Sequence, residues 1–472
     1  MRIIDQAYID GAFVTPHGDD WAELHNPATE EVIGRVRLGD AEDVEAAVAA
    51  AKRAWPSWRE TSKAERIAVL ERLSTAVAAR RDDLVQAMRE EYGAPAFFVG
   101  WSVDHAAGTF LDAARTLEAY DFTRTVGSAE VTLAPMGVVA AITPWNSNLG
   151  FICAKIATAL AAGCTIVVKP SEMSAIQTQV LVECLHEAGA PAGVFNIVNG
   201  RGAVAGAALS AHLDVAKVSF TGSTVTGKAI LKAGAETVKR VTLELGGKSP
   251  TILLDDADLS AALPIALMTG FGNSGQACIA GTRLLVPESR MDEVLPILKA
   301  GVEGVRVGPA TDPGVQVGPM VSQVQWERVQ GYIRLGLQEG AQLLTGGEGR
   351  PEGLERGWFV RPTVFVGVTN AMRIAREEIF GPVLCVIPYR DEAEAVAIAN
   401  DTAYGLAAYV LGEDLERAKR VARRIDAGRV VINGAPHDPR VPFGGFKQSG
   451  LGREYGVFGL ETHLEPRAVM TP

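Results

Sequence analysis

Hydrophobic and polar positions alternate differently along the chain, and the first change of pattern lies near residue 137. Residues 41–55 follow Asp40, a residue type that caps helices, and end before Pro56, so they predict a helix. Residues 62–93 place apolar side chains at steps of three and four, and Gly93 follows as a C-cap. The first part of the chain is therefore expected to be helical.

From residue 137 onward, short apolar runs alternate with helical stretches. The predicted strands are 137–145, 164–170, 193–200, 216–223 and 241–247. Such uniformly apolar strands are typical of sheets buried on both faces, and the intervening helices imply right-handed crossovers and a parallel sheet. Residues 150–168 contain Lys155 and two glycines, and we interpret them as a buried helix leading into a strand.

A second alternating region follows Gly246 and Gly247, which mark the expected boundary between two α/β units. Its predicted strands are 250–256, 283–287, 383–389, 407–413 and 428–435, and its predicted helices are 255–271, 391–400 and 414–427. Residues 128–135 resemble an isolated hairpin strand that belongs to neither unit.

Composition excludes several classes of protein. The chain has 472 residues, of which 47% are hydrophobic and 21% charged, with a net charge of −11. These values are typical of a soluble globular protein and argue against a nucleic-acid partner. The N-terminus lacks the apolar core of a signal peptide, and no apolar run reaches the roughly 18 residues that span a membrane. Five cysteines without CxxC or histidine spacing predict no metal site and a reducing, cytoplasmic location.

Cys278 lies in the segment GNSGQACIAGTR (272–283), among glycines, alanines and small polar residues. A buried core thiol, a metal ligand and a nucleophile are the three interpretations. Small neighbours let a backbone approach a ligand closely, which favours the nucleophile. An ordinary cysteine has a pKa of about 8.5, so a nucleophilic thiolate needs activating groups nearby.

Two polar residues qualify as partners of Cys278. Glu244 stands between apolar residues at the end of a predicted strand, as a buried ion-pair partner or as a general base with a raised pKa. Asn146 follows another strand, where it either forms a turn or turns its amide toward a developing oxyanion.

Two further segments indicate a nucleotide cofactor. In SFTGSTVTG (219–227) a strand ends in Gly-Ser before a helix, whose N-terminus can hold a pyrophosphate. Lys169 and Glu172 follow another strand and either hydrogen-bond ribose hydroxyls or form a charged helix cap. The segment GRGAVAG (200–206) has the wrong spacing for a dinucleotide motif and adds little.

Together these motifs resemble those of the NAD(P)-dependent aldehyde dehydrogenase superfamily, from about residue 8 to 470. The matching segments are 142-ITPWN-146, 169-KPSE-172, 220-FTGST-224, 243-LELGGKSP-250, 275-GQAC-278, 377-EEIFGPV-383 and 442-PFGGFKQSGLGRE-454. Their number and order make a chance resemblance very improbable.

The resemblance implies a role for each candidate catalytic residue. Cys278 attacks the aldehyde carbonyl, and the amide of Asn146 and the Cys278 backbone N–H stabilise the oxyanion. Hydride passes to the nicotinamide, and Glu244 activates the water that hydrolyses the resulting thioester. Glu454 is expected to be a second carboxylate that relays protons through water.

The resemblance also implies the cofactor contacts. Lys169 and Glu172 would hold the adenosine ribose, Glu378 the nicotinamide ribose and Ser223 the pyrophosphate, with Phe380 near the nicotinamide ring. Further expected contacts are Ile142, Thr143, Pro144, Trp145, Gly202, Phe220, Gly222 and Leu245. The charge of Glu172 disfavours a 2′-phosphate, so NAD is preferred; Lys169 can offset that charge, so NADP stays open.

The implied fold is α/β, with a Rossmann-type cofactor domain (1–118 and 138–245), an α/β catalytic domain (246–460) and a small β oligomerisation arm (119–137 and 461–472). The arm implies a homodimer or homotetramer. Arg240, Arg453 and Glu465 are expected to form an ion network between the subunit interface and the active site.

The sequence departs from the family pattern at two places. Residues SNLGF (147–151) stand where many members have an aromatic residue followed by Pro and Leu. The loop 434–441 contains His437, Asp438 and Arg440, where members often line the substrate entrance. Arg440 either meets a carboxylated aldehyde or is a surface arginine, which we favour. The physiological aldehyde is left open.

Two other functions are compatible with the same fold. A CoA-acylating semialdehyde dehydrogenase would release its product to CoA, but such relatives typically lack the glutamate found here as Glu244. An inactive binding protein is disfavoured by the intact set Asn146, Glu244, Cys278 and Glu378.

Overall fold

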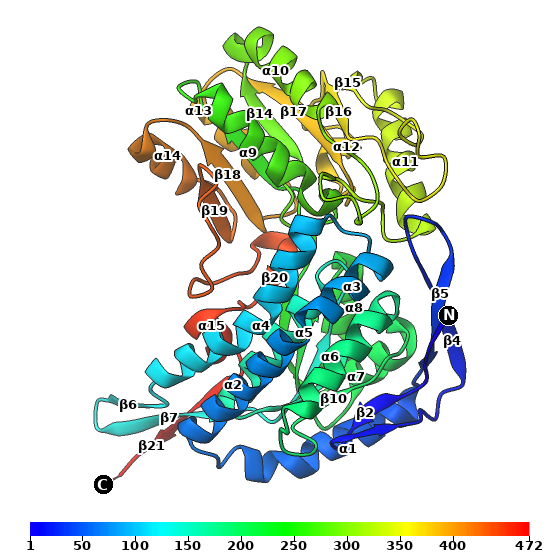
Figure 1. The fold of residues 1–472 in the computed structure, drawn as a ribbon. Coiled ribbons are helices and arrows are strands. Elements are labelled where there is room, and N and C mark those ends of the chain that lie inside the picture. The colour runs from blue at the N-terminus through cyan, green and yellow to red at the C-terminus, as the bar shows by residue number, and fades with distance from the viewer. Residues whose placement is uncertain (472) are drawn as a thin grey trace.

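The computed structural model describes residues 1–471 and contains two α/β bodies, one above the other in Figure 1. Each body is built on one large sheet, of eight strands in the lower body and seven in the upper. A three-stranded sheet with the C-terminus protrudes at the lower left, and an N-terminal ribbon runs along the right-hand side. The ribbon consists of β1 (Arg2–Ile4), β4 (Asp20–His25) and β5 (Val32–Leu38).

The eight-stranded sheet confirms the predicted parallel arrangement. Its order is β20-β12-β11-β8-β9-β10-β2-β3. The parallel strands are β8 (Val138–Ile142), β9 (Thr165–Lys169), β10 (Phe195–Ile197), β11 (Val215–Thr221) and β12 (Arg240–Glu244), and the antiparallel edges are β2 (Ala7–Ile9), β3 (Ala12–Val14) and β20 (Gly450–Leu451). Val139 and Ala141 enter one hydrophobic core, while Val138 and Ala140 enter another, so both faces are buried.

Helices cover both faces of this sheet. One face carries α2 (Lys63–Ala79), α3 (Arg81–Glu91), α4 (Ala96–Ala119), α5 (Asn148–Ala162) and α6 (Ala175–Glu187). The other carries α1 (Ala41–Trp58), α7 (Ala207–Ala211) and α8 (Thr224–Ala235). The predicted buried helix with Lys155 is α5, which leads into β9.

Three details of the N-terminal prediction were wrong. The first 38 residues contain five strands rather than helix: β1, β2 and β3 have three residues each, and β4 and β5 pair at the surface with mixed polar and apolar positions. The stretch 62–93 is two helices, since Arg80 leaves the helical conformation (φ −104°, ψ 25°) between them. Helix α1 continues past Pro56 because Trp58 packs into the core. The Asp40 and Gly93 caps are confirmed: the Asp40 side chain accepts two backbone N–H groups, and Gly93 has φ +73°.

The seven-stranded sheet has the order β15-β16-β17-β14-β13-β18-β19. Its parallel strands are β13 (Pro250–Leu253), β14 (Arg283–Pro287), β16 (Thr363–Val366), β17 (Val383–Tyr389), β18 (Ala407–Leu411) and β19 (Arg429–Ile432), with β15 (Gln342–Thr345) antiparallel at the edge. Its helices are α9 (Leu259–Phe271), α10 (Met291–Glu303), α11 (Gln323–Gln338), α12 (Arg373–Arg376), α13 (Glu392–Asn400) and α14 (Leu415–Ala422). The predicted strands are confirmed, although α14 ends five residues before the expected position.

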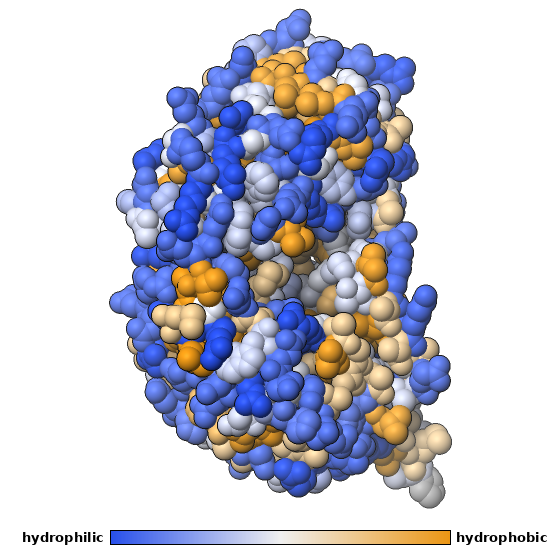
Figure 2. All heavy atoms as spheres, turned by 90° about the vertical axis from the view of Figure 1, so that its right-hand side faces the viewer, coloured by the Kyte–Doolittle hydropathy of each residue, from blue (hydrophilic) through white to orange (hydrophobic). Residues whose placement is uncertain are grey.

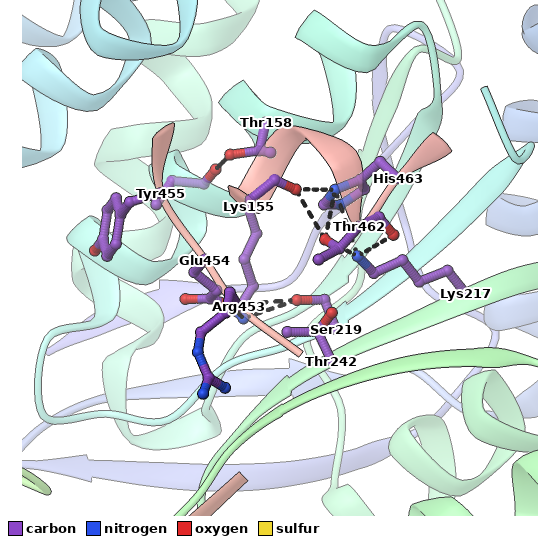
Figure 3. Close-up of a pocket in the computed structure, with 12 residues that line it drawn as sticks. Lys155, Thr158, Lys217, Ser219, Thr242, Arg453, Glu454, Tyr455, Thr462 and His463 are labelled. Carbon is purple, nitrogen blue, oxygen red and sulfur yellow. Dashed lines mark hydrogen bonds and ion pairs between the residues drawn. The ribbon is translucent and has the colours of Figure 1, made fainter. Parts of the chain in front are cut away.

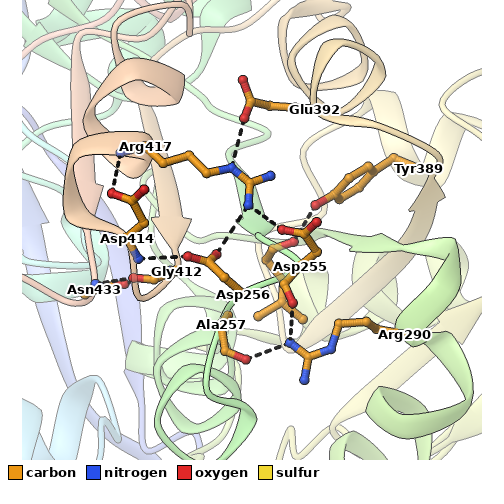
Figure 4. Close-up of polar contacts among 11 residues, drawn as sticks. Asp255, Asp256, Ala257, Arg290, Tyr389, Glu392, Gly412, Asp414, Arg417 and Asn433 are labelled. Atoms are coloured by element: carbon orange, nitrogen blue, oxygen red, sulfur yellow. Dashed lines mark hydrogen bonds and ion pairs between the residues drawn. The ribbon is translucent and has the colours of Figure 1, made fainter.

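Charged side chains hold together the end of this sheet that lies away from Cys278. Arg417 forms ion pairs with Asp255 and with Glu392, the latter at 3.1 Å, and lies 3.7 Å from Asp256 (Figure 4). Arg290 donates to the carbonyl of Ala257 at 2.7 Å. These contacts fix the C-terminal ends of the strands. The sheet is therefore rigid, and the opposite ends of its strands lie near Cys278.

The predicted hairpin is the protruding arm. It contains β6 (Thr123–Val126), β7 (Ala129–Pro135) and β21 (Leu464–Val469), paired antiparallel in the order β21-β7-β6. Of these strands, β21 follows helix α15 (Gly456–Glu461). Residue 472, the last of the predicted arm, lies outside the described residues. Arg240 and Glu465 form an ion pair of 2.7 Å. Arg453 instead donates to the carbonyls of Gly445 and Gly452, so within this chain it does not join that pair.

The surface in Figure 2 is mostly hydrophilic and is hollowed between the two bodies. No helix within residues 1–471 has both the length and the apolar character needed to cross a membrane.

Candidate active site

Cys278 lies where two cavities meet between the two bodies. The first, here the Glu378 cavity, has a volume of about 250 Å³. The second, here the Trp101 cavity, has a volume of about 260 Å³. Cys278 and Asn146 line both cavities, so a molecule in either one can reach the sulfur.

The loop before Cys278 has an unusual backbone that only certain residues tolerate. Asn273, Ser274 and Gly275 all have positive φ, at 53°, 58° and 70°. A Cβ at Gly275 would lie 2.3 Å from the carbonyl of Gly381, so glycine is required on steric grounds as well. The strain is compensated by hydrogen bonds: Tyr92 donates to the Asn273 side chain at 2.8 Å, and the Ser274 hydroxyl accepts from the N–H of Gly318 at 2.8 Å.

Asn146 is buried and held in a fixed orientation beside this loop. Its Nδ2 donates to the backbone carbonyl of Gln276 at 3.0 Å, and its backbone carbonyl accepts from the side-chain amide of Asn273 at 3.0 Å. Gln276 is anchored in turn to Pro319 and Val321. An amide NH₂ has two donors, so the second N–H of Asn146 is free to bind an oxygen beside Cys278.

The thiol of Cys278 is not intrinsically a thiolate. Burial raises its pKa, and the carboxylates of Glu378 and Glu244 raise the pKa further. The backbone N–H groups of Cys278 and Ile279 point at the sulfur and oppose part of that rise. These N–H groups are also placed to stabilise an anionic oxygen bound to the carbon that the sulfur attacks.

Glu244 ends β12 and is almost fully buried, with 1% of its surface exposed. Neither carboxylate oxygen has a hydrogen-bond partner among residues 1–471. Burial raises its pKa well above the usual range, and the Glu454 carboxylate raises it further, while Lys155 and Arg453 act in the opposite direction. A carboxylate with a raised pKa and two free oxygens is suited to accept a proton from water. Because Glu244 has no bonded partner among residues 1–471, the contacts do not support the alternative interpretation of Glu244 as half of a buried structural ion pair.

The predicted second carboxylate, Glu454, belongs to a polar cluster (Figure 3), and the charges of Glu454 and Lys155 act on Glu244. Glu454 pairs with Lys155 at 2.5 Å, and Lys155 also donates to Ser219 at 2.9 Å. Nearby, Lys217 donates to the carbonyl of Thr462 at 2.7 Å. Glu454 is therefore a charge partner of Lys155 that also influences Glu244.

The Glu378 cavity collects many of the residues that were expected to contact a cofactor. These are Pro144, Trp145, Gly222, Ser223, Leu245, Glu378 and Phe380. Glu378 accepts from the N–H of Gly247 at 3.0 Å, and burial raises its pKa to about 7. Phe380 has φ +64° and packs edge-on against Trp145 with ring centroids 5.5 Å apart.

The other expected cofactor residues lie outside that cavity. They are Ile142, Thr143, Lys169, Glu172, Gly202 and Phe220. Lys169 donates to the carbonyl of Gly200 at 2.8 Å and lies 3.4 Å from Glu172. Ile142 and Phe220 are buried in β8 and β11. Gly202 begins a π-helical turn that leads into α7.

The Trp101 cavity contains the residues that the sequence did not reveal. Phe98, Trp101 and His105 come from α4, which was not identified as a separate helix, and Tyr455 and Arg429 come from the C-terminal part. Trp101 and His105 stack at 5.0 Å. No sequence signal distinguishes these residues, because aromatic side chains at helical spacing usually indicate core packing.

The loop 434–441 contributes His437 to this cavity, but Arg440 points away from it. Arg440 binds Asp438 at 2.6 and 2.9 Å, and its side chain is 85% exposed. It is the surface arginine that we favoured.

Comparison with known proteins identifies the family. The model of the aldehyde dehydrogenase family matches residues 13–469. A curated 3-succinoylsemialdehyde-pyridine dehydrogenase from a Pseudomonas species is 49% identical, over 100% of this chain and 99% of the relative. A crystal structure of a Pseudomonas syringae aldehyde dehydrogenase variant with NAD⁺ and octanal has a TM-score of 0.97 and 46% identity, over 99% of this chain and 96% of the other. A Mycobacterium tuberculosis aldehyde dehydrogenase with NAD⁺ has a TM-score of 0.96 and 41% identity, over 100% of this chain and 98% of the other. The chain belongs to the aldehyde dehydrogenase family.

Proposed function

We propose that the chain oxidises an aldehyde to a carboxylic acid at Cys278, with NAD as the hydride acceptor. The observation that supports this most strongly is that Cys278 and Asn146 line both cavities. A cofactor in one cavity and an aldehyde in the other would meet at the sulfur. Glu244 lines the Glu378 cavity and supplies the base for hydrolysis.

Unpartnered polar atoms near the Glu378 cavity fit a dinucleotide. The buried hydroxyls of Thr221, which lines the cavity, and of Thr143, which precedes the cavity-lining Pro144, have no hydrogen-bond partner in the described part of the chain. Buried polar groups without partners are costly, and ribose hydroxyls and phosphate oxygens can satisfy them. Helix α8 starts beside Ser223, which lines the cavity, and helix N-termini favour phosphate. When bound, NAD would supply the hydride acceptor beside Cys278, in line with the relatives crystallised with NAD⁺.

NAD is the preferred cofactor in this proposal, and NADP is the weaker alternative. Glu172 would repel a 2′-phosphate. Lys169 is bound to the Gly200 carbonyl as well as to Glu172, so its charge is only partly available to the phosphate.

The oxidation step uses the groups around the sulfur. The carboxylate of Glu244, which lines the same cavity, takes the proton of the Cys278 thiol, and the resulting thiolate attacks the carbonyl carbon. The carbonyl oxygen becomes an anion that accepts hydrogen bonds from the free Asn146 N–H and the Cys278 backbone N–H. When that oxyanion collapses, the carbon loses a hydride and becomes a thioester on Cys278. The aldehyde is thereby oxidised by two electrons.

Hydrolysis then uses Glu244. Its carboxylate takes a proton from a water molecule, the hydroxide attacks the thioester carbon, and the C–S bond breaks to release the acid and the Cys278 thiolate. Glu244 can pass the proton toward Glu454 and Lys155, the charged pair behind it. This role for Glu454 fits the expected relay.

The structure supports aldehydes of more than one chemical class as substrates. The aromatic walls of the Trp101 cavity suit flat or apolar groups. Two of the relatives named above concern a pyridine semialdehyde and octanal. We further propose that the arm joins subunits into a dimer or tetramer, that the domains follow the predicted boundaries, and that the protein works in the cytoplasm.

The test is NADH formation from a panel of aliphatic, aromatic and carboxylated aldehydes, with NAD or NADP, in the wild type and in Cys278→Ala. Activity that disappears in the variant and does not need CoA is the expected result. Binding of NAD without oxidation of any aldehyde would instead support the inactive binding protein. A requirement for CoA would support the CoA-acylating enzyme.

A further inference from the structure

Among residues 1–471, the formally charged side chain that lines the Trp101 cavity is that of Arg429. Arg429 is the first residue of β19 and is partly exposed to the cavity. The two histidines of the cavity are neutral at physiological pH, because burial lowers the pKa of His105 and lowers that of His437 to about 4. No aspartate or glutamate lines the cavity.

Arg429 also lacks a partner within the protein. Its backbone N–H donates to the carbonyl of Leu406, but across residues 1–471 its guanidinium forms no ion pair and no hydrogen bond. By contrast Arg417, whose side chain is also only partly exposed at 26%, contacts three carboxylates. A partly desolvated guanidinium without a partner is unfavourable, so Arg429 is poised for an anion.

The position of Arg429 places that charge inside the aldehyde-side cavity. After burial, its charge is the next cause of the lowered pKa of His437, and it opposes the rise that burial causes in the pKa of Tyr455; both residues line this cavity. Cys278 lines the same cavity, so an aldehyde with its carbonyl at the sulfur can extend toward Arg429. Arg440 cannot serve instead, because it is exposed and bound to Asp438.

We propose that Arg429 binds the carboxylate of the substrate, and that the preferred substrates are aldehydes carrying a carboxylate at the end opposite the carbonyl. A planar guanidinium can donate two parallel hydrogen bonds to a carboxylate. Between the two ends, the stacked Trp101 and His105 and the ring of Phe443 accommodate a flat or apolar spacer. This inference rests on the proposed oxidation at Cys278.

The test compares matched pairs of aldehydes that differ only in charge: a series of ω-carboxylated aldehydes of increasing length, together with carboxybenzaldehydes, each beside its methyl ester. The quantity is the ratio of kcat/KM for the acid to that for the ester, measured in wild type, Arg429→Met, Arg429→Lys and Arg440→Met. The best acid of the series is expected to exceed its ester by at least about 10-fold in the wild type.

Arg429→Met is expected to lower that ratio about 10- to 100-fold, Arg429→Lys to lower it less, and Arg440→Met to leave it unchanged. Thermal unfolding checks that each variant is folded. If Arg429→Met does not fold, the wild-type ratio and competitive inhibition by the matching dicarboxylates decide the question. A wild-type ratio near one for every pair would overturn the inference, as would an unchanged ratio in folded Arg429→Met. Either result leaves aldehyde oxidation intact, whereas oxidation of no aldehyde at all would refute the proposed function itself.

Discussion

Gly247→Ala is predicted to displace the nucleophile without changing any reacting group. A Cβ at position 247 would lie 2.4 Å from the carbonyl oxygen of Cys278. An ordinary contact needs roughly 3.4 Å, so the Cys278 backbone must move by about 1 Å. A misplacement of about 1 Å can lower a catalysed rate about 100-fold. The strain should also reduce stability by about 1–3 kcal/mol.

The assay is kcat/KM for the best aldehyde together with thermal unfolding of the same samples. Gly272→Ala is the matched control, because Gly272 lies in the Cys278 loop, has φ −51° and has no atom within 4 Å of an added Cβ. We expect the control to retain wild-type kcat/KM. Wild-type kcat/KM in folded Gly247→Ala would refute the view that the position of the Cys278 backbone limits the reaction.

Three further predictions concern the oxyanion, the cofactor and pH. Asn146→Ala should lower kcat about 100- to 1,000-fold through loss of one oxyanion donor, and a kcat within tenfold of wild type would contradict that role. Glu172→Gln should increase the kcat/KM ratio of NADP to NAD, because it removes the charge that repels the 2′-phosphate; an unchanged ratio would mean that another residue selects the cofactor. Glu378 has a pKa of about 7, so its carboxylate loses charge as the pH falls through that value, and NAD binding measured by fluorescence should weaken there. The pH dependence should be absent in Glu378→Gln, and its persistence in that variant would assign it to another group.

The sequence predicted the central elements of both sheets because their strands are buried on both faces. Strands such as β8 and β18 are fully buried along their length, so they appear as nearly continuous apolar runs. The short N-terminal strands β2 and β3 contain three residues each, too few to show a period. The break between α2 and α3 depends on the conformation of Arg80, which the apolar spacing does not encode.

The catalytic motif residues were likewise accessible from the sequence, but the walls of the aldehyde-side cavity were not. Cys278, Asn146 and Glu244 stand in short motifs whose chemistry is distinctive. Trp101 and His105 face a cavity only because α4 packs over the Cys278 loop, and this tertiary contact is not encoded in the local sequence pattern. Arg429 begins a strand, where an arginine ordinarily reaches solvent, and its unpartnered state is visible only once the surrounding side chains are placed.

The central claim is that Cys278 carries the oxidation and Glu244 the hydrolysis. It is tested most directly by a single-turnover experiment on Glu244→Gln. Within residues 1–471 both oxygens of Glu244 are unpartnered, whereas Glu378, in the same cavity, accepts from the N–H of Gly247 and Glu454 is paired with Lys155, so Glu244 is the carboxylate best placed to accept the proton in hydrolysis. The account predicts a burst of one NADH per active site, followed by slow turnover, with the acyl group detected by mass spectrometry on the peptide that contains Cys278. Steady turnover at the wild-type rate, or an absence of the acyl group from that peptide, would contradict it.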